Sequence, residues 1–427
     1  MSRKELILKL TDEDLNKIEN DLQIEINNDN ASSSYNKKYK NLYLFEQLDN
    51  YISVPFSYNI NFPRTERKIL PSMKVKFEAE LRDNQKDVKN EAIKYLNDFG
   101  SVIISAACGF GKTALSISLA TVIKLKTLIL CNRIVLIKQW KESILKFCPS
   151  AKIQIIDSKN EIDDDMDFYI MNAANVYKYS IEYFKNIGTV ICDELHIIMA
   201  EKISNCMKFL FPRYLIGLSA TPYRSDGFDK LISLYFGENK IIRKLYREHI
   251  IYKYVTEYKP DVKLNSLGKV DWNSVIESIS NNEERNKDII NIVKMFKDRN
   301  FLIPCKRVSQ AEYLYQKFKE EGEYVTSLIG NKQEYDSNAR ILIGTVQKCS
   351  VGFDHPGLNA MIIASDVEQY FEQYLGRVFR TETVIPIIFD IVDNFGLLYK
   401  HYKSRESVYI EHGGKIKNFL KEFPKFK

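Results

Sequence analysis

Residues 101–113 read SVIISAACGFGKT, and the apolar segment ALSISLATVI follows directly. The stretch fits the pattern G-x-x-x-x-G-K-[S/T], except that Ala106 stands where the first glycine is usual. Gly109 and Gly111 let backbone N–H groups approach phosphate oxygens at a helix N-terminus, where the helix dipole favours an anion. We therefore expect a buried strand, a phosphate-binding loop and a helix, rather than a plain glycine turn between a strand and a helix.

The loop contains the side chains that ATP and Mg²⁺ require. Lys112 is placed to contact the β and γ phosphates, and the hydroxyl group of Thr113 is placed to ligate Mg²⁺. The residues predicted to bind ATP in this loop are Ala107, Cys108, Gly109, Phe110, Gly111, Lys112 and Thr113. ATP and Mg²⁺ are therefore the expected cofactors.

Two adjacent carboxylates end another strand-like run, TVICDELH at residues 189–196. A P-loop ATPase needs an acid at this point to hold Mg²⁺, and Asp193 is placed for that role. Glu194 would then polarise the attacking water. An Asp-Glu pair also suits the first turn of a helix, but the preceding phosphate-binding loop favours a catalytic pair.

Strand-like and helix-like segments alternate along the chain. Apolar runs recur as TLILC, IQII, FYIM, TVICD and YLIGLS, and after residue 289 as FLIPC, YVTSLI, RILIGT, AMIIAS and PIIFDIV. Strands that alternate with helices predict parallel sheets with helices on both faces. The predicted fold class is therefore α/β, with two tandem parallel-sheet domains and a small N-terminal accessory domain.

These runs also predict the domain boundaries. We expect an accessory domain at 1–80, a first sheet domain at 81–227, an irregular linker at 228–282, a second sheet domain at 283–400 and a C-terminal tail at 401–427. The accessory domain is expected to be a separate and partly strand-rich unit, because it combines the polar stretch NNDNASSSYNKKYK with the aromatic segment YLFEQLDNYISVPFSYNINF.

Composition narrows the class of protein. Hydrophobic residues make up 45% and charged residues 28% of the chain, which excludes wholesale disorder. The net charge of +6 permits a polyanionic partner without requiring one. The seven cysteines form no CxxC pair, so neither a zinc nor a redox motif is indicated, and reduced thiols in an intracellular protein are expected. No apolar run has the length of a signal peptide core or a membrane span, so no membrane association is expected.

The order of the motifs resembles that of superfamily 2 helicases. In that family D-E-x-H follows the phosphate-binding loop, a Ser-Ala-Thr motif comes next, and Q-x-x-G-R-x-x-R comes late in the chain. Here residues 193–196 read DELH, residues 217–224 read GLSATPYR, and residues 373–380 read QYLGRVFR. Together with the loop, these blocks extend over most of the chain, and their joint specificity is high. The resemblance implies two RecA-like domains and a nucleic-acid-dependent ATPase.

One branch of this superfamily is more similar still. It is typified by the repair and transcription helicase XPB, phage UvsW and the poxvirus transcript-release helicase. That branch has LR-x-x-Q before the loop, as at residues 81–85, and text similar to ATPYRSDG, as at residues 220–227. The loop sequence ACGFGKT resembles the loop sequences of enzymes from large cytoplasmic DNA viruses. The resemblance therefore implies a viral protein of the host cytoplasm and the virion.

The resemblance also assigns roles outside the loop and the acid pair. It implies that Arg82 and Gln85 recognise and bind the adenine base of ATP. The residues implied to couple hydrolysis to domain movement are His196, Ser219 and Thr221. The residues implied to act on the γ-phosphate from the second domain are Gln373, Arg377 and Arg380. An arginine in that position also makes physical sense, because it stabilises charge that develops on a transferred phosphoryl group. A solvated helix face is the alternative for the arginine pair.

The implied nucleic-acid contacts lie where strands end. In the segment RILIGTVQKCSVGFDHPGLN, Thr345 would contact a phosphate, while Gly352 and Asp354 would lie near the ribose of ATP. Its alternative is a strand followed by a glycine turn. Further phosphate-contacting candidates follow the runs TLILC and FLIPC, and they are Asn132, Arg133, Lys306 and Arg307.

The predicted function is that of an ATP-dependent helicase or translocase that moves along DNA, with RNA as the alternative, largely independently of base sequence and in viral transcription, replication or repair. Leu195 departs from the Ala or Ser of many relatives, but the functional atoms belong to its neighbours. Three alternatives remain at this point. They are a duplex translocase that does not separate strands, a non-catalytic nucleic-acid-binding subunit, and the motor subunit of a restriction system.

Overall fold

The computed structural model describes residues 3–7, 11–26, 40–48, 51–58, 69–107, 109–157, 161–200, 204–220, 229–244, 246–330, 332, 334–350, 353, 355–367, 371–380 and 383–426. The chain divides into two compact units, residues 1–106 with 111–242 and residues 107–110 with 243–427. Four candidate site residues lie outside the described residues, namely Cys108, Thr221, Gly352 and Asp354.

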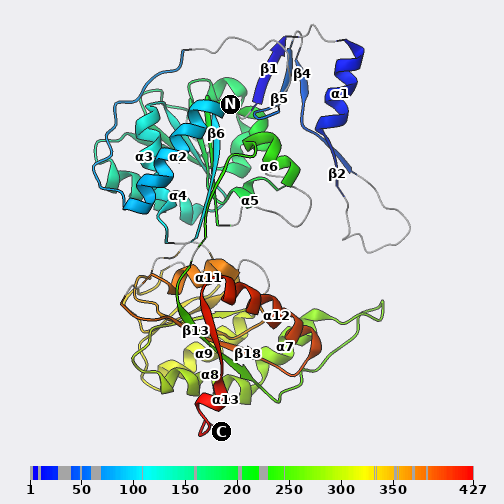
Figure 1. The fold of residues 1–427 in the computed structure, drawn as a ribbon, viewed down its shortest axis with the longest axis vertical. Helices are drawn as coiled ribbons and strands as arrows, with labels where there is room; N and C mark the ends of the chain where they lie inside the picture. Colours follow the sequence, from blue (N-terminus) through cyan, green and yellow to red (C-terminus); the bar gives the residue numbers. More distant parts are fainter. Residues whose placement is uncertain are drawn as a thin grey trace. The chain divides into compact units, whose positions relative to one another are not determined.

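A seven-stranded sheet forms the centre of the first unit's described part (Figure 1). The order of its strands is β12-β6-β11-β10-β7-β9-β8. Its strands are β6 Ser101–Ala106, β7 Thr127–Cys131, β8 Ile153–Ile155, β9 Phe168–Asn172, β10 Thr189–Cys192, β11 Tyr214–Ser219 and β12 Lys240–Arg243. Neighbouring strands from β6 to β8 all pair in parallel. This is the arrangement that the alternation of strands and helices predicted.

Helices cover both faces of this sheet. One face carries α2 Asp83–Phe99, α3 Lys112–Ile123 and α4 Ile134–Phe147, and the other carries α5 Leu195–Ile198 and α6 Asp229–Phe236. Three short 3-10 helices span Ala173–Lys178, Ile181–Phe184 and Ser204–Phe209. Because both faces are covered, β6, β7 and β10 are buried at every residue, which explains their continuous apolar runs.

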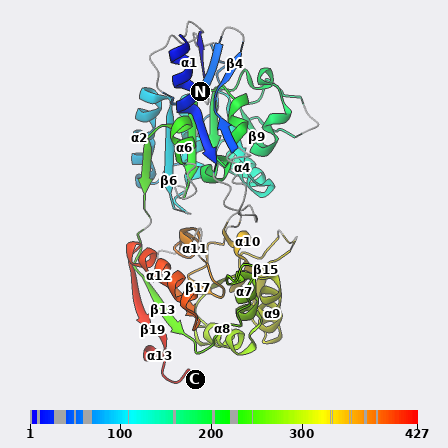
Figure 2. The same cartoon turned by 90° about the vertical axis from the view of Figure 1, so that its right-hand side faces the viewer.

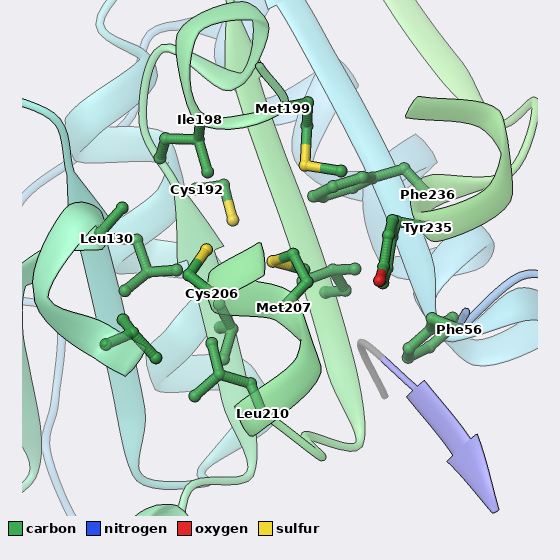
Figure 3. Close-up of a cluster of buried hydrophobic side chains, with 14 of the residues drawn as sticks. Phe56, Leu130, Cys192, Ile198, Met199, Cys206, Met207, Leu210, Tyr235 and Phe236 are labelled. Carbon is green, nitrogen blue, oxygen red and sulfur yellow. The ribbon is translucent and has the colours of Figure 1, made fainter. Parts of the chain in front are cut away.

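The N-terminal residues fold onto the first unit. They form α1 Asp12–Leu22 and the strands β1 Arg3–Ile7, β2 Gln23–Ile26, β3 Lys40–Tyr43, β4 Glu46–Leu48 and β5 Tyr51–Pro55. Two antiparallel sheets result, with the orders β1-β5-β4 and β2-β3. Phe56 is buried in the same hydrophobic core as Tyr235 and Phe236 of α6 (Figure 3). This shared core is the physical reason why the N-terminal region groups with the first sheet and not as a separate unit.

The second unit has a seven-stranded sheet of its own among the residues that the structure describes (Figure 2). The order of its strands is β15-β16-β14-β17-β18-β13-β19. Its strands are β13 His249–Val255, β14 Phe301–Cys305, β15 Val325–Leu328, β16 Ile341–Thr345, β17 Ala360–Ile363, β18 Ile387–Val392 and β19 Gly414–Asn418. All six neighbouring pairs are parallel.

Alternate residues of these strands enter two hydrophobic cores, one on each face. On β14, Phe301 and Ile303 belong to one core and Leu302 belongs to the other. The first core includes side chains from α8 Glu283–Met295, α9 Val308–Glu320 and α13 Phe419–Glu422. The second includes side chains from α10 Val346–Ser350, α11 Phe371–Val378 and α12 Gly396–Glu411. A further helix, α7 Trp272–Asn281, packs against α8 and α9.

The regular structure differs from the expected segmentation at two places. The expected linker at 228–282 contains α6 and β12 of the first unit, then β13 and α7 of the second. The expected tail at 401–427 contains most of α12 and the edge strand β19. The sequence of β19, GKIKN, gives no alternating apolar signal, because an edge strand is held by backbone hydrogen bonds and is partly exposed.

No helix in the described part of the chain is both long and apolar enough to cross a membrane.

Candidate active site

The phosphate-binding loop joins β6 to α3 through a left-handed glycine. Gly111 is the N-cap of α3 with φ of 89°, and its carbonyl group accepts a hydrogen bond from the Leu115 N–H at 3.1 Å. L-residues with a side chain rarely adopt this backbone conformation. The ammonium group of Lys112 donates a hydrogen bond to the Ala106 carbonyl, which holds it where β6 ends. The helix therefore begins at the lysine, two residues before the expected segment ALSISLATVI, and the positive end of its dipole points at the loop.

Arg82 and Gln85 lie against this loop, although Gln85 precedes Gly111 by 26 positions in the sequence. The Gln85 side chain accepts a hydrogen bond from the Arg82 N–H at 2.9 Å, and its Nε2 lies 3.5 Å from the Gly111 carbonyl oxygen. A Cβ atom on Gly111 would come within 2.3 Å of Gln85 Nε2 and 3.0 Å of an Arg82 Nη atom. The glycine is thus required both by its conformation and by the close approach of these two side chains.

Asp193 follows β10 directly, and both of its carboxylate oxygens accept hydrogen bonds. The Trp140 indole N–H donates to one oxygen at 2.7 Å, and the Glu194 backbone N–H donates to the other at 3.0 Å. Burial is the main cause and the charge of Glu194 the second cause that together raise the pKa of Asp193 from 3.8 to about 6. The Trp140 hydrogen bond and the charge of Lys112 lower this pKa, so the lysine of the loop acts on the acid pair.

Glu194 connects the acid pair to the end of β11. It has φ of 53° and ψ of 57°, a left-handed conformation that costs a residue with a Cβ atom about 1–2 kcal/mol. Its Oε2 atom is buried without a hydrogen-bond partner among the described residues and lies 3.6 Å from His196 Nδ1. His196 in turn forms a 2.9 Å hydrogen bond with the Ser219 hydroxyl group. The structure therefore brings together Glu194 and His196 of the DELH motif and Ser219 of the SAT motif.

The donor groups around Asp193 fit Mg²⁺. This cation prefers oxygen ligands, and it is bound by one or two carboxylates together with phosphates and water. No cluster of three or more His, Cys, Asp or Glu side chains that could hold a metal occurs among the described residues. Asp193 and Glu194 nevertheless bring two carboxylates together, burial disfavours the charge of Asp193, and a divalent cation would offset that charge. Mg²⁺ would be held by Asp193 and Thr113, with nucleotide phosphates as further ligands.

The second unit holds its predicted arginines on and just beyond α11. The Arg377 guanidinium donates a hydrogen bond to the Phe353 carbonyl at 2.8 Å and stacks over the Phe353 ring at 4.9 Å. Burial raises the pKa of Tyr335, and Arg377 and Arg380 both act against this rise, so both guanidinium groups lie near the same phenol. Gln373 is buried in α11, and its Oε1 has no hydrogen-bond partner within the described chain.

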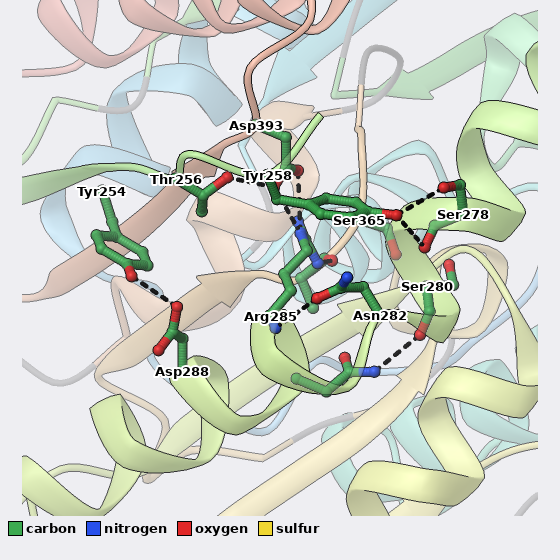
Figure 4. A network of polar contacts seen from close by, with 12 residues as sticks. Tyr254, Thr256, Tyr258, Ser278, Ser280, Asn282, Arg285, Asp288, Ser365 and Asp393 are labelled. Carbon is green, nitrogen blue, oxygen red and sulfur yellow. Dashed lines mark hydrogen bonds and ion pairs between the residues drawn. The ribbon is translucent and has the colours of Figure 1, made fainter. Parts of the chain in front are cut away.

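Most of the residues predicted to contact nucleic acid also form contacts within the protein or are buried in it. Arg307 donates to the Asn273 side chain at 3.0 Å, and Lys306 pairs with the buried Asp366 at 3.8 Å. The Lys306 N–H bonds to Ser365 at 3.0 Å. Figure 4 shows Ser365 in the polar network around the buried pair of Arg285 and Asp393, whose side chains are 2.9 Å apart. Thr345 is buried at the end of β16. Asn132 and Arg133 lie between β7 and α4, half-buried.

Trp140 holds the Asp193 carboxylate and is not among the residues that the sequence predicted for the site. In the segment IVLIKQWKESILKF, this tryptophan stands at helical spacing with other apolar residues, so it is read as a core residue. It is indeed buried, with 2% of its surface exposed, but its N–H group faces the acid pair. A buried indole N–H usually finds a hydrogen-bond acceptor, so the sequence could have predicted that Trp140 bonds to some acceptor but not that the acceptor is Asp193.

Three features together define a class of protein: a glycine loop at the start of a helix, an acid pair after another parallel strand of the same sheet, and tandem parallel sheets. The fold and the first unit's site are those of a P-loop ATPase with two RecA-like domains.

Comparisons with known proteins agree with this class. A family model described as "Type III restriction enzyme, res subunit" matches residues 78–224. "Putative helicase 161L" of Invertebrate iridescent virus 6 is 43% identical over 412 residues, which cover 90% of this chain and 93% of that protein. "Putative helicase 055L" of Frog virus 3 is 32% identical over 343 residues, 79% of each chain. The solved structure of S. cerevisiae Dbp5 bound to RNA and ADP BeF3 shares the fold, with a TM-score of 0.56, 13% identity and coverage of 79% of this chain and 91% of that chain.

The chain belongs to the superfamily 2 helicases, in the group that contains these proteins of large DNA viruses, as its motifs predicted. As a member of that superfamily it is a nucleic-acid-dependent ATPase.

Proposed function

We propose that this chain is an ATP-driven translocase that moves along DNA in an infected host cell and serves viral transcription, replication or repair. The observation that carries the proposal is the connected series of side chains from the acid pair to the end of β11. His196 lies 3.6 Å from the Glu194 carboxylate and 2.9 Å from the Ser219 hydroxyl group. Such a connection would let a change at the phosphate reach another loop of the same unit. DNA is proposed because LR-x-x-Q and ATPYRSDG resemble the XPB and UvsW branch.

Hydrolysis is proposed to take place at the loop and the acid pair. Lys112 contacts the β and γ phosphates at the N-terminus of α3, where the helix dipole favours the anion. Bound Mg²⁺ would supply charge neutralisation on the phosphate oxygens, with Asp193 and Thr113 as its protein ligands. Glu194 orients the attacking water and accepts its proton. Arg82 and Gln85, which lie against Gly111, are proposed to bind the adenine.

Arginines of the second unit are proposed to complete the reaction. Charge spreads over the transferred phosphoryl group in the transition state, and an arginine at that point accelerates the reaction by roughly 10³ to 10⁵. Arg377 is proposed for this role with Arg380, and Gln373 nearby. Support comes from the hydrogen bond and the stacking on Phe353, which fix the Arg377 guanidinium in one orientation.

Movement along DNA is proposed to depend on strand-end residues that contact phosphates and not base edges. These proposed contacts are Asn132, Arg133, Lys306, Arg307 and Thr345. Because phosphate contacts carry no base information, binding would be largely independent of sequence and would weaken as salt rises. His196 and Ser219 are proposed to couple hydrolysis to this movement, together with Thr221.

The first test is ATP turnover with single-stranded DNA, duplex DNA and RNA as separate activators. We expect DNA to stimulate hydrolysis more than RNA does. Lys112→Ala, Glu194→Gln and Arg377→Ala should each abolish the stimulated rate, whereas Lys94→Ala, at an exposed position on α2, should leave it unchanged. Near-normal turnover in folded Glu194→Gln protein would contradict the role given to that residue.

Strand displacement and triplex displacement assays separate the two kinds of movement. Removal of a triplex-forming strand together with separation of a duplex would identify a helicase in the strict sense. Triplex removal alone would identify a duplex translocase that leaves the strands paired. Absence of both, with ATP turnover intact, would contradict translocation.

A further inference from the structure

Trp140 lies on α4, whereas the two carboxylates of the acid pair, Asp193 and Glu194, follow β10. Its Nε1 atom lies 2.7 Å from Asp193 Oδ2, and the two residues are 53 positions apart in the sequence. The contact is short for an N–H···O hydrogen bond, as expected where the acceptor is a carboxylate. The indole N–H can only donate, so it cannot exchange roles with its partner.

Two donors together fix the orientation of the Asp193 carboxylate. Trp140 holds Oδ2, and the backbone N–H of Glu194 holds Oδ1 at 3.0 Å. Each carboxylate oxygen has more than one lone pair, so both oxygens keep acceptor capacity after these bonds are made. The plane of the carboxylate is therefore set while its remaining lone pairs are available to a cation.

Trp140 is itself held firmly. It is 2% exposed and lies on the buried face of α4 with Leu136, Ile137 and Ile144. Its helix packs against β7 and β9 and follows β7, the strand that pairs in parallel with β10. The packing of α4 on the sheet therefore fixes where the indole N–H points, as a supporting shell must if it is to position a ligand.

We propose that Trp140 is a positioning residue that holds the Asp193 carboxylate in the orientation that binds Mg²⁺ with the nucleotide. The inference rests on the proposed function, because it takes Asp193 as the carboxylate that holds the cation. Partners that orient a ligating side chain change metal affinity about 10- to 100-fold when they are removed. Loss of the indole N–H should therefore weaken Mg²⁺-dependent nucleotide binding and leave Mg²⁺-independent binding unchanged.

Binding of a fluorescent ADP analogue, measured with EDTA and with Mg²⁺, tests this without turnover. Trp140→Phe keeps an aromatic ring in the core but removes the donor. We expect the dissociation constant in EDTA to stay unchanged and the dissociation constant in Mg²⁺ to rise. The ratio of the EDTA value to the Mg²⁺ value should therefore fall about tenfold or more. The matched control is Trp272→Phe, which changes the chain's other tryptophan, on α7, and should keep the ratio of the unmodified protein.

A spectroscopic measurement covers the case in which Trp140→Phe fails to fold. Trp272→Phe protein has Trp140 as its single tryptophan, so its emission reports on the acid pair. With unlabelled ADP bound, replacing EDTA by Mg²⁺ should change the intensity of this emission.

Three results would count against these statements. Trp140→Phe protein with the unmodified ratio would overturn the inference, and so would Trp140 emission that does not respond to Mg²⁺ when the nucleotide is bound. An unmodified protein whose nucleotide binding gains nothing from Mg²⁺ would instead overturn the proposed metal role of Asp193, and the inference with it.

Discussion

Replacing Asp193 with asparagine should make the folded protein more stable at neutral pH when neither Mg²⁺ nor nucleotide is present. The carboxyl group of Asp193 has a pKa of about 6 in the folded chain, against 3.8 for an ordinary aspartate. The folded chain thus binds this proton more tightly than the unfolded chain does. Its contribution to stability is complete below about pH 4 and is lost as pH rises through 6. Asparagine carries no charge, so its contribution does not depend on pH.

The size of the effect follows from the same pKa difference. One pKa unit corresponds to about 1.4 kcal/mol, so a rise of roughly two units corresponds to about 3 kcal/mol at pH 8. Asparagine can still accept the hydrogen bond from Trp140 through its side-chain oxygen. Its amide group would then face the Glu194 N–H and lose that bond, at about 1 kcal/mol. The expected net gain for Asp193→Asn is therefore about 2 kcal/mol at pH 8.

The assay is thermal unfolding of both proteins in EDTA from pH 5 to pH 8. For a unit of about 150–250 residues, 1 kcal/mol moves the unfolding midpoint by roughly 2–4 °C. The midpoint of Asp193→Asn should exceed that of the unmodified protein by about 5 °C at pH 8, and the difference should shrink as pH falls. A difference that stays constant across this range would refute the reasoning, because only titration of the carboxylate makes it depend on pH.

Three further changes test other parts of the structure. Gly111→Ala should weaken binding of a fluorescent ADP analogue at least tenfold, because the new Cβ meets the side chains beside the loop; Gly322→Ala shares the positive φ but has open space, and should leave this binding unchanged. Ser219→Ala should retain ATP binding but lower the distance translocated per ATP hydrolysed, as measured by triplex displacement beside phosphate release. Arg405→Ala should lower the free energy of unfolding by about 3–5 kcal/mol in urea titrations, because it takes the guanidinium partner from the buried Asp390 and from the buried Asp366, whereas Lys403→Ala removes an exposed pair and should not shift the midpoint.

The sequence by itself determined the elements that local chemistry controls. The fully buried parallel strands appear as continuous apolar runs because helices cover both faces of each sheet. The loop at Gly111 and the pair at Asp193 could be predicted because each lies where a strand ends, and the backbone around them depends on neighbouring residues in the chain. The order of the motifs then identified the superfamily, which the comparisons confirmed.

Only the tertiary structure decided which distant side chains meet. Trp140 reaches Asp193 because β7, which precedes α4, pairs with β10 in the sheet order. The N-terminal region joins the first unit because Phe56 fits the core beside α6, and β19 extends the second sheet through backbone hydrogen bonds. These contacts depend on the packing of whole elements, and neither the spacing nor the apolar pattern of the residues involved encodes them.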